Sequence, residues 1–244
     1  VSVDQDSFTF IDTAGVRRKK SEHEVVDKFA AIRTERAIKR ADVCLLMLDV
    51  QEGLSVQDKK IACQIEREGK GCILLFNKWD AVKGYRMEHC QAALREEAFF
   101  LRYCPPLFIS AKTGRNLENI FPLIKEVHRF LHMRLPTGHL NTFIEKALQR
   151  KSPPMIQGKR LRIYYMAQVD TNPPRFVFFV NKVALMDETY KKYLINQFRE
   201  YYHFTGAPLL FFLKGKAPPK KAPIEILSNT PSKELLFEVK NSLS

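Results

Sequence analysis

The chain has 244 residues, of which 45% are hydrophobic, so a folded core is expected and intrinsic disorder is not. No apolar run reaches the ~18 residues needed to cross a bilayer, and the opening VSVDQDSFTF lacks the pattern of a signal peptide. The five cysteines form no C-x-x-C pair and are odd in number, which argues against a disulfide framework and favours a cytoplasmic protein without membrane contact.

The formal net charge of +13 is concentrated in the second part of the chain. Residues 1–134 hold 23 Lys and Arg against 19 Asp and Glu, whereas residues 135–244 hold 17 against 8. The excess is therefore +4 in the first part and +9 in the second. A basic region favours a polyanionic partner, most commonly nucleic acid, over the alternative of a merely soluble, basic surface.

Apolar periodicity predicts alternating strands and helices over the first 134 residues. Two of the strands are nearly continuous apolar runs, as expected where a sheet is covered on both faces. The alternation predicts an α/β fold with a mostly parallel sheet, which binds ligands at the carboxyl ends of its strands. The predicted strands cover 7–12, 43–50, 71–76 and 106–110, and the predicted helices cover 25–41, 56–68, 86–100 and 116–132.

A linker is predicted at RLPTGH (134–139), where Pro and Gly break the helical pattern. A small α+β module follows, in which Asp187 caps a helix between the last two strands. We therefore expect a first domain at 1–134, a second at 139–216, and a basic linker and tail at 217–244. The elements predicted for the module are a helix at 140–150, a loop at 151–159, strands at 160–169 and 175–183, a helix from 188 to about 202, and a strand at 208–215.

Asn77, Lys78, Trp79 and Asp80 come directly after a buried strand. A carboxylate accepts two parallel hydrogen bonds from adjacent N–H donors, and the guanine edge offers such a pair in its ring N–H and exocyclic amine. Adenine would leave the carboxylate unpaired, which is costly. The Asn77 amide can donate toward the base, and the stem of Lys78 can lie along its plane. The motif N-K-x-D therefore predicts selection of guanine.

Two further polar motifs stand at the ends of predicted strands. In DTAG (12–15), Asp12 can hold Mg²⁺ through water, and the Gly15 N–H can meet a terminal phosphate. In SAK (110–112), the Ala111 N–H is placed to donate to the guanine keto oxygen. Three such motifs in this order predict a GTPase of the large P-loop class that binds GTP or GDP with Mg²⁺. The residues predicted to contact the nucleotide are Asp12, Thr13, Ala14, Gly15, Asn77, Lys78, Asp80, Ser110, Ala111 and Lys112.

Longer stretches resemble one family of GTPases. FIDTAGVRRK and ERAIKRADVCLLMLDVQEGLSVQDKKIA are similar to the second GTPase domain of the tandem GTPase family Der, also called EngA. SPPM, NPP and LMDETYKKYLINQFREYY are similar to the KH-like domain that closes those proteins, so the resemblance covers residues 7–216. It implies GTP hydrolysis stimulated by K⁺, a role in biogenesis of the large ribosomal subunit, and ribosomal RNA as a partner. It also implies a KH-like domain packed between two GTPase domains, so that this domain serves RNA contact or interdomain contact. We expect a monomer.

The phosphate-binding motif G-x-x-x-x-G-K-[ST] has no match in these 244 residues. The residues expected to select guanine are present, whereas those that grip and cleave the phosphates are mostly missing. We therefore expect a piece of a longer protein, with a sheet incomplete at its N-terminus. Alone it should bind GTP poorly and hardly hydrolyse it, and no catalytic residue is assigned.

Val16 follows DTAG, at the place where many small GTPases carry a water-orienting Gln. An apolar side chain cannot polarise water, so a monovalent cation near the phosphates, as the resemblance implies, is the candidate. The segment 16–29 is the predicted nucleotide-dependent switch. Its basic start, residues 17–20, either meets RNA or a partner or is a solvated loop.

The second domain lacks the G-x-x-G turn with which KH domains clamp a nucleic-acid backbone, because no Gly pair in 139–216 has that spacing. Lys159, Arg160 and Arg162 gather at the entry of a predicted strand and are the predicted RNA phosphate contacts. The aromatic residues are expected to form core more often than base-stacking platforms. They lie at 164–165, 176–179 and 198–204.

Two hypotheses from different classes stay open. The first is a GTP-hydrolysing switch that docks on ribosomal RNA through its KH-like domain. The second is a non-enzymatic RNA-binding module with a remnant nucleotide pocket. A G-x-x-x-x-G-K-[ST] motif just upstream of Val1 would favour the first. A related GTPase of tRNA modification or membrane remodelling is disfavoured by the KH-like ending and by the lack of an amphipathic membrane segment.

Overall fold

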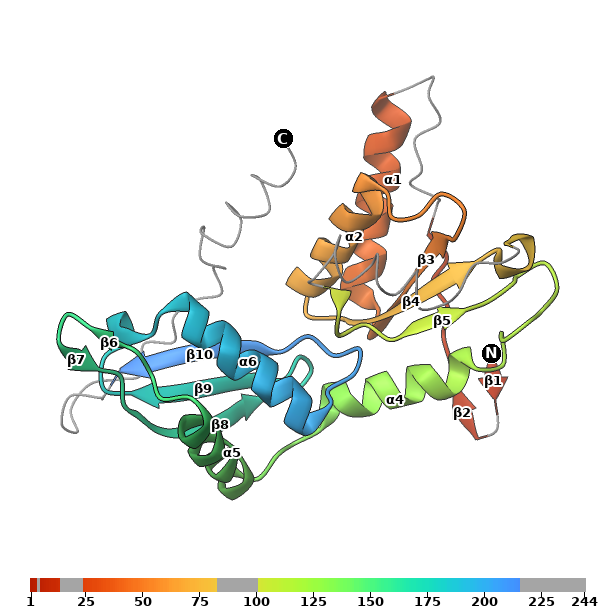
Figure 1. The fold of residues 1–244 in the computed structure, drawn as a ribbon. Coiled ribbons are helices and arrows are strands. Elements are labelled where there is room, and N and C mark those ends of the chain that lie inside the picture. The colour runs from red at the N-terminus through yellow and green to blue at the C-terminus, as the bar shows by residue number, and fades with distance from the viewer. Residues whose placement is uncertain (4, 14–23, 83–100, 216–244) are drawn as a thin grey trace.

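The computed structural model describes residues 1–3, 5–13, 24–82 and 101–215. Figure 1 shows two α/β parts that follow one another along the chain and meet near the end of helix α4 (Ile120–His132). The predicted helix at 86–100, most of the predicted switch and the tail at 217–244 lie outside the described residues. No helix in the described ranges is long and apolar enough to cross a membrane.

The first part is built on a parallel sheet, as predicted. Its strands are β3 (Val43–Asp49), β4 (Gly71–Asn77) and β5 (Pro106–Phe108), in the order β3-β4-β5. The register pairs Asp49 with Asn77, so the carboxyl ends of β3 and β4 lie side by side. A site assembled from strand ends is therefore possible at this edge.

Helices cover both faces of this sheet because successive side chains of a strand point to opposite sides. Cys72, Leu74 and Phe76 of β4 pack with helix α2 (Val56–Arg67), whereas Ile73 and Leu75 pack with α4. All six residues from Gly71 to Phe76 are buried. Ser55 starts α2 with a capping box, in which its hydroxyl accepts from the Asp58 N–H while the Asp58 carboxylate accepts from the Ser55 N–H.

The prediction of a strand at 7–12 is wrong for residues 8–12. Instead, β1 (Ser2–Val3) and β2 (Asp6–Ser7) form a short antiparallel hairpin, and residues 8–13 belong to no strand. A segment becomes a strand only when a neighbour pairs with its backbone, and within the described ranges no strand lies beside it. Phe10 and Ile11 are accordingly exposed.

Strand β3 is also less buried than its apolar sequence predicts. Met47 is 52% exposed, and Val43 and Leu45 are only half-buried. One edge of β3 pairs with β4, while its other edge has no partner among the described strands. Helix α1 (Glu24–Arg40) precedes it and agrees with the prediction at 25–41.

The second part has the predicted α+β order. Its sheet runs β10-β9-β8, with β8 antiparallel to β9 and β9 parallel to β10. The bounds are α5 (Thr137–Arg150), β6 (Met155–Ile156), β7 (Lys159–Arg160), β8 (Ile163–Asp170), β9 (Arg175–Val180), α6 (Glu188–Tyr202) and β10 (Leu210–Gly215). The Asp187 carboxylate accepts from the Thr189 N–H, which confirms the predicted helix cap.

Two predictions in this part need correction. Helix α5 starts at Thr137, so the linker predicted at 134–139 is too long. Pro136 occupies the N-cap position and Gly138 lies in the first turn, where neither residue interrupts the helical hydrogen bonds. The stretch predicted as a loop at 151–159 contains β6 and begins β7, which pair as a short hairpin.

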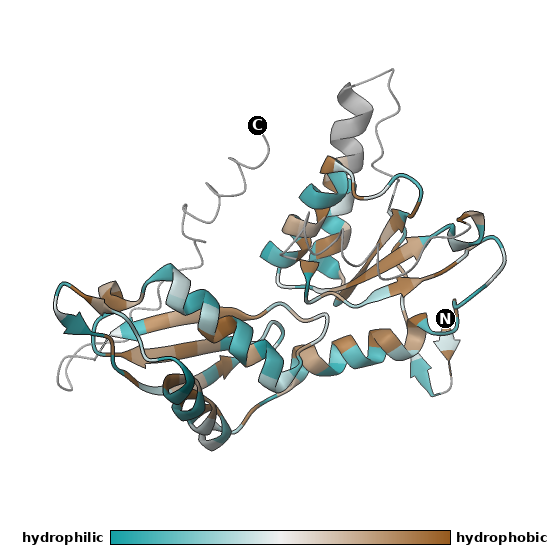
Figure 2. Ribbon diagram, viewed as in Figure 1, coloured by the Kyte–Doolittle hydropathy of each residue, from teal (hydrophilic) through white to brown (hydrophobic). Residues whose placement is uncertain are grey.

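Helices α5 and α6 cover one face of the second sheet (Figures 1 and 2). Phe176 and Phe178 of β9 pack there against Phe198, which also meets Phe143 edge to face. These aromatic residues are core, as predicted, whereas Tyr164 and Tyr165 are exposed. The two faces of this sheet therefore differ in burial, because the face away from α5 and α6 carries exposed side chains such as Tyr165.

The two parts meet at the amino end of β4, opposite the strand ends that carry the motifs. The Cys72 N–H donates to the Gly206 carbonyl at 2.9 Å, and the Gly206 N–H donates to the Tyr103 carbonyl at 2.6 Å. The guanidinium of Arg199 stands 4.6 Å from the centre of the Tyr103 ring. Main-chain bonds thus join the loop after α6 to the first sheet.

Candidate functional site

The loop after β4 is anchored by Trp79 and so presents Asp80 outward. Lys78 has a φ of 65°, which reverses the chain, and residues Trp79–Ala81 form a short 3-10 turn. The Trp79 ring is buried, with its centre 4.6 Å from the centre of the Phe108 ring, and the main-chain N–H of Trp79 donates to the Ile109 carbonyl at 3.1 Å. The buried indole fixes the loop, while the Asp80 carboxylate stays accessible.

Two predicted motifs, NKWD and SAK, are tied to each other. The Ser110 hydroxyl donates to Oδ1 of Asp80 at 2.5 Å, and Oδ1 of Asn77 accepts from the Ala111 N–H at 3.0 Å. Ser110 is fully buried, and its oxygen also accepts from the Thr113 N–H. These bonds hold the loops after β4 and β5 in one arrangement.

The Ala111 N–H has a partner within the protein. It is predicted to donate to a guanine keto oxygen, and in this structure it donates to Oδ1 of Asn77. A ligand at this place would have to share that N–H with Asn77. The Nδ2 group of Asn77 lies 3.6 Å from the sulfur of Met47, a weak acceptor, so this donor remains suited to a better partner.

The carboxylate of Asp80 is held in its charged form. The hydrogen bond from Ser110 lowers the pKa of Asp80, and the charge of Lys112 lowers it further, while burial opposes both. Lys112 itself is exposed. An ionised carboxylate only accepts hydrogen bonds, so this group suits a partner with two adjacent N–H donors.

Lys78 is paired with a residue that the sequence analysis missed. Its Nζ lies 2.5 Å from Oδ2 of Asp49, the last residue of β3. Asp49 is buried, and its Oδ1 accepts from the Gln51 N–H at 3.0 Å. The available signal was the position of Asp49, an acidic residue that ends an apolar strand at the same edge as NKWD.

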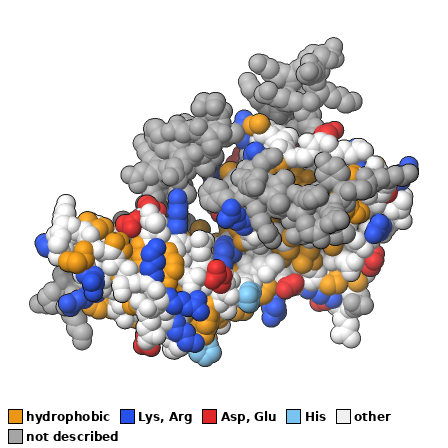
Figure 3. Space-filling model, in the orientation of Figure 1, with side chains coloured by type: hydrophobic (Ala, Val, Ile, Leu, Met, Phe, Trp, Pro, Cys, Tyr) orange, Lys and Arg blue, Asp and Glu red, His pale blue; other side chains and the backbone are white. Residues whose placement is uncertain are grey.

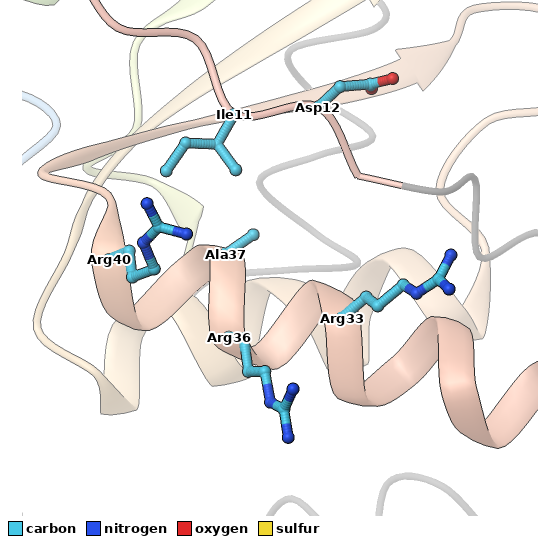
Figure 4. Close-up of a pocket in the computed structure, with 6 residues that line it drawn as sticks. All are labelled: Ile11, Asp12, Arg33, Arg36, Ala37 and Arg40. Atoms are coloured by element: carbon cyan, nitrogen blue, oxygen red, sulfur yellow. The ribbon is translucent and has the colours of Figure 1, made fainter.

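Asp12 and Thr13 lie apart from this group. Both are exposed, and no described hydrogen bond or ion pair joins them to NKWD or SAK. A cavity of about 420 Å³ lies between the segment that holds Asp12 and helix α1. Figure 4 shows Ile11 above Ala37, with three arginines projecting from α1. These are Arg33, Arg36 and Arg40, which the sequence analysis did not single out. Ala14 and Gly15 lie outside the described residues.

The three cations predicted to contact RNA lie close together and exposed. Lys159 and Arg160 form β7, and Arg162 directly precedes β8. The Asn181 side chain joins Arg160 and Arg162, because its amide donates to the Arg160 carbonyl and its oxygen accepts from the main-chain N–H of Arg162.

Comparison with known proteins supplies the family. Residues 2–133, more than half of the chain, match the family described as Elongation factor Tu GTP binding domain. The chain belongs to this family of GTP-binding domains. Residues 134–214 match the family described as KH-domain-like of EngA bacterial GTPase enzymes, C-terminal. The fold expected from the sequence, a GTPase-like parallel sheet followed by a KH-like α+β domain, is therefore confirmed.

Curated relatives carry the name GTPase Der. One from Protochlamydia amoebophila is 64% identical over 92% of the chain, and one from Ruminiclostridium cellulolyticum is 43% identical over 86%. These matches cover 46% and 48% of the two relatives, so the chain spans about half of their length. Among solved structures, Era from Aquifex aeolicus matches 86% of this chain and 76% of its own, at 19% identity and a TM-score of 0.40. A TM-score of 0.40 is too low to support an argument about this chain.

Proposed function

We propose that the chain is the guanine-selecting region of a GTPase of the Der type, which hydrolyses GTP during biogenesis of the large ribosomal subunit. The observation that carries the proposal is the Asp80 carboxylate, fixed by Ser110 and left open at the end of β4. The ring N–H and exocyclic amine of guanine match its two acceptor oxygens. Adenine offers no such pair, and a carboxylate left without partners opposes its binding.

Around this carboxylate we assign supporting roles to the other residues of NKWD and SAK. The Asn77 amide donates toward the base, and the Ala111 N–H is shared between Asn77 and the keto oxygen. The stem of Lys78 lies along the base plane, positioned by its ion pair with Asp49. Lys112 adds positive charge near Asp80. The bonds between the two loops support this assignment, because a preorganised site costs less to order on binding.

Phosphate binding needs groups beyond these. In the proposal, Asp12 holds Mg²⁺ through water, beside Thr13, Ala14 and Gly15. Within the described residues no group of three His, Cys, Asp or Glu side chains is arranged around a metal. Mg²⁺ is usually held by few carboxylates together with water and phosphate oxygens, so the proposal needs one carboxylate, that of Asp12. The remaining phosphate contacts, and a K⁺ that stimulates hydrolysis, belong to the complete GTP-binding domain.

The KH-like domain is proposed to contact ribosomal RNA. Positive charge supports this, because residues 135–244 carry 17 Lys and Arg against 8 Asp and Glu. Figure 3 shows that Lys and Arg side chains outnumber acidic ones on the α5 and α6 side of this part, so the positive charge is not confined to the opposite face. We propose Lys159, Arg160 and Arg162 as phosphate contacts. We further propose that the protein is a monomer in the cytoplasm, with domains at 1–134 and 139–216.

One observation favours a second candidate function. No G-x-x-x-x-G-K-[ST] motif occurs in the 244 residues, so a non-enzymatic RNA-binding module with a remnant nucleotide pocket is the alternative. The two differ in whether guanine nucleotides bind when upstream coding sequence is included.

Calorimetry with GDP and GTP, in Mg²⁺ and K⁺, tests the proposal. The 244-residue chain is compared with a chain extended upstream, each beside an Asp80→Ala variant. We expect tight binding by the extended chain and its loss in the variant. An extended chain that binds neither nucleotide would favour the RNA-binding module.

A further inference from the structure

The second sheet has an outer face that no described helix covers. Side chains of β8, β9 and β10 alternate between the core with α5 and α6 and this opposite face. Figure 1 shows α5 and α6 on the near side of the sheet, so the outer face points away from the viewer. Its side chains belong to Tyr165, Ala167, Val169, Arg175, Val177, Phe179, Leu210, Phe212 and Lys214.

One end of the outer face is an aromatic surface. Tyr165 of β8 and Phe179 of β9 are paired across the sheet, and their rings stack with centres 4.2 Å apart and planes 15° from parallel. Tyr165 is 41% exposed, and its neighbour Tyr164, at a register shift of β8, is 49% exposed. Lys214 of β10 is paired with Phe179, with its Nζ 5.8 Å from the ring centre. Tyr165 therefore presents part of its ring to solvent, while Phe179 supports that ring from within the sheet face.

Cations surround this end of the sheet. Arg162 and Lys182 lie close together at this end of the sheet, because the main-chain N–H groups of both residues donate to the Asn181 side chain. Arg160 is held to the same side chain through its carbonyl. Within the described ranges none of these three cations forms an ion pair, so their charges remain available to a ligand.

Cations on the helix side of the domain are engaged differently. Lys146 donates to the Tyr201 hydroxyl, Arg150 donates to Gln197, and Lys151 stands over the Tyr193 ring. The other end of the outer face also differs, because Arg175 there pairs with Asp170. At the Tyr165 end of the described domain, an exposed ring that is backed by a second ring therefore lies near cations without a described ion pair.

We infer that the outer face binds single-stranded RNA, with a base stacked on Tyr165, whose ring is backed by Phe179, and phosphates held by Arg160, Arg162 and Lys182. Every base has a π face, so such a platform accepts bases without strict sequence preference. Base stacking and phosphate contacts of this kind do not require the G-x-x-G turn with which other KH domains clamp the RNA backbone. The inference rests on the proposed RNA-binding role and names the surface that performs it.

Fluorescence anisotropy with a labelled mixed-sequence single-stranded RNA tests the inference on the 244-residue chain. Tyr165→Leu and Phe179→Leu keep an apolar side chain but remove the ring, and each should weaken binding about tenfold. The matched control is Tyr201→Leu, because Tyr201 is also exposed, at 48%, and also has a lysine over its ring, Lys146 at 5.2 Å. It lies on α6 and should leave the affinity unchanged.

Salt dependence tests the cations separately. An Arg160→Gln, Arg162→Gln double variant should make the negative slope of log affinity against log salt concentration shallower by about one to two, because each lost phosphate contact releases one counterion fewer. A duplex RNA of the same composition should bind less tightly than the single strand, since its bases are not free to stack on protein.

Cross-linking of the unsubstituted chain keeps the test valid if a variant fails to fold. With 4-thiouridine in the RNA, adducts are expected on peptides that contain Tyr165 or Phe179. Adducts on α6 instead, or Leu variants that bind like the unsubstituted chain, would overturn the inference while leaving RNA binding intact. Absence of any RNA binding would overturn both the inference and the proposed RNA-binding role, whereas guanine-nucleotide binding is measured independently.

Discussion

The ammonium group of Lys78 lies 2.5 Å from the buried carboxylate of Asp49. The two residues come from neighbouring strand ends, because the register of β3 and β4 pairs Asp49 with Asn77. The side chain of Lys78 is 54% exposed and that of Asp49 only 3%, so a buried carboxylate anchors an exposed ammonium group. The ion pair therefore fixes the direction of Lys78 over the edge where the nucleotide is proposed to bind.

Asp49→Asn should weaken guanine-nucleotide binding by about three- to tenfold in the extended chain, because Lys78 loses its charged partner. Lys78→Met should have a similar effect, and the double variant should lose little more than either single one. Calorimetry with GDP measures all three. Effects that simply add would show that the ion pair does not act on the nucleotide.

Ser110→Ala should raise the pKa of Asp80, because the hydrogen bond from Ser110 is the main cause of its lowered value. A carboxyl with a lowered pKa in the folded state stays charged until the pH falls through that pKa, so the loss of charge should occur at higher pH in the variant. Carbon-detected NMR titration of the Asp80 carboxyl measures this. Ser55→Ala, which removes the unrelated contact with Asp58, should leave the titration of Asp80 unchanged.

Gly206→Ala should destabilise the contact between the two parts by about 2–4 kcal/mol. Gly206 has a φ of +71°, and an added Cβ would lie 2.4 Å from Cγ2 of Val127. Gly158 is a matched control, because its φ is +70° and nothing lies within 4 Å of its Cβ position. Gly158→Ala should therefore cost only the backbone strain, about 1 kcal/mol. Urea unfolding compares them, and equal losses would contradict the tight contact with Val127.

Thiols in the first sheet should resist alkylation until the protein unfolds. Burial raises the pKa of Cys44 to about 12, and a hydrogen bond with Cys104, together with burial, raises the pKa of Cys72, so few thiolates form at pH 8. Cys63 is only partly buried and should react sooner. Iodoacetamide labelling followed by peptide mass spectrometry measures each site. Rapid labelling of Cys44 in the native chain would show that this core is open.

The sequence predicted the parallel sheet because the runs 43–50 and 71–76 are apolar and separated by helical patterns. NKWD and SAK could be placed at the same edge, since carboxyl ends of parallel strands share an edge. The sequence could not predict that residues 8–12 form no strand, because a strand needs a paired neighbour as well as a suitable sequence. Asp49 was missed for a related reason: strand register, which local pattern does not give, brings it to Lys78.

The outer face of the second sheet shows the same limit. Alternating burial in 164–169 and 175–180 is visible in the sequence only as a dense run of apolar and aromatic residues. Which aromatic side chains turn outward depends on the register shift beside Tyr165. Core aromatic residues such as Phe198 were predicted correctly, whereas the exposed Tyr164 and Tyr165 were not distinguished from them.

The central claim is that the carboxylate of Asp80 reads guanine, and the most direct measurement is the base preference of an Asp80→Asn variant in the extended chain. Xanthine has a carbonyl where guanine has the exocyclic amine, so the amide of Asn can donate to it while its oxygen accepts the ring N–H. Calorimetry should show preference for GDP over XDP in the unsubstituted chain, and a shift toward XDP of at least about a hundredfold in the variant. If the variant keeps its preference for GDP, or the unsubstituted extended chain prefers neither nucleotide, Asp80 does not select the base.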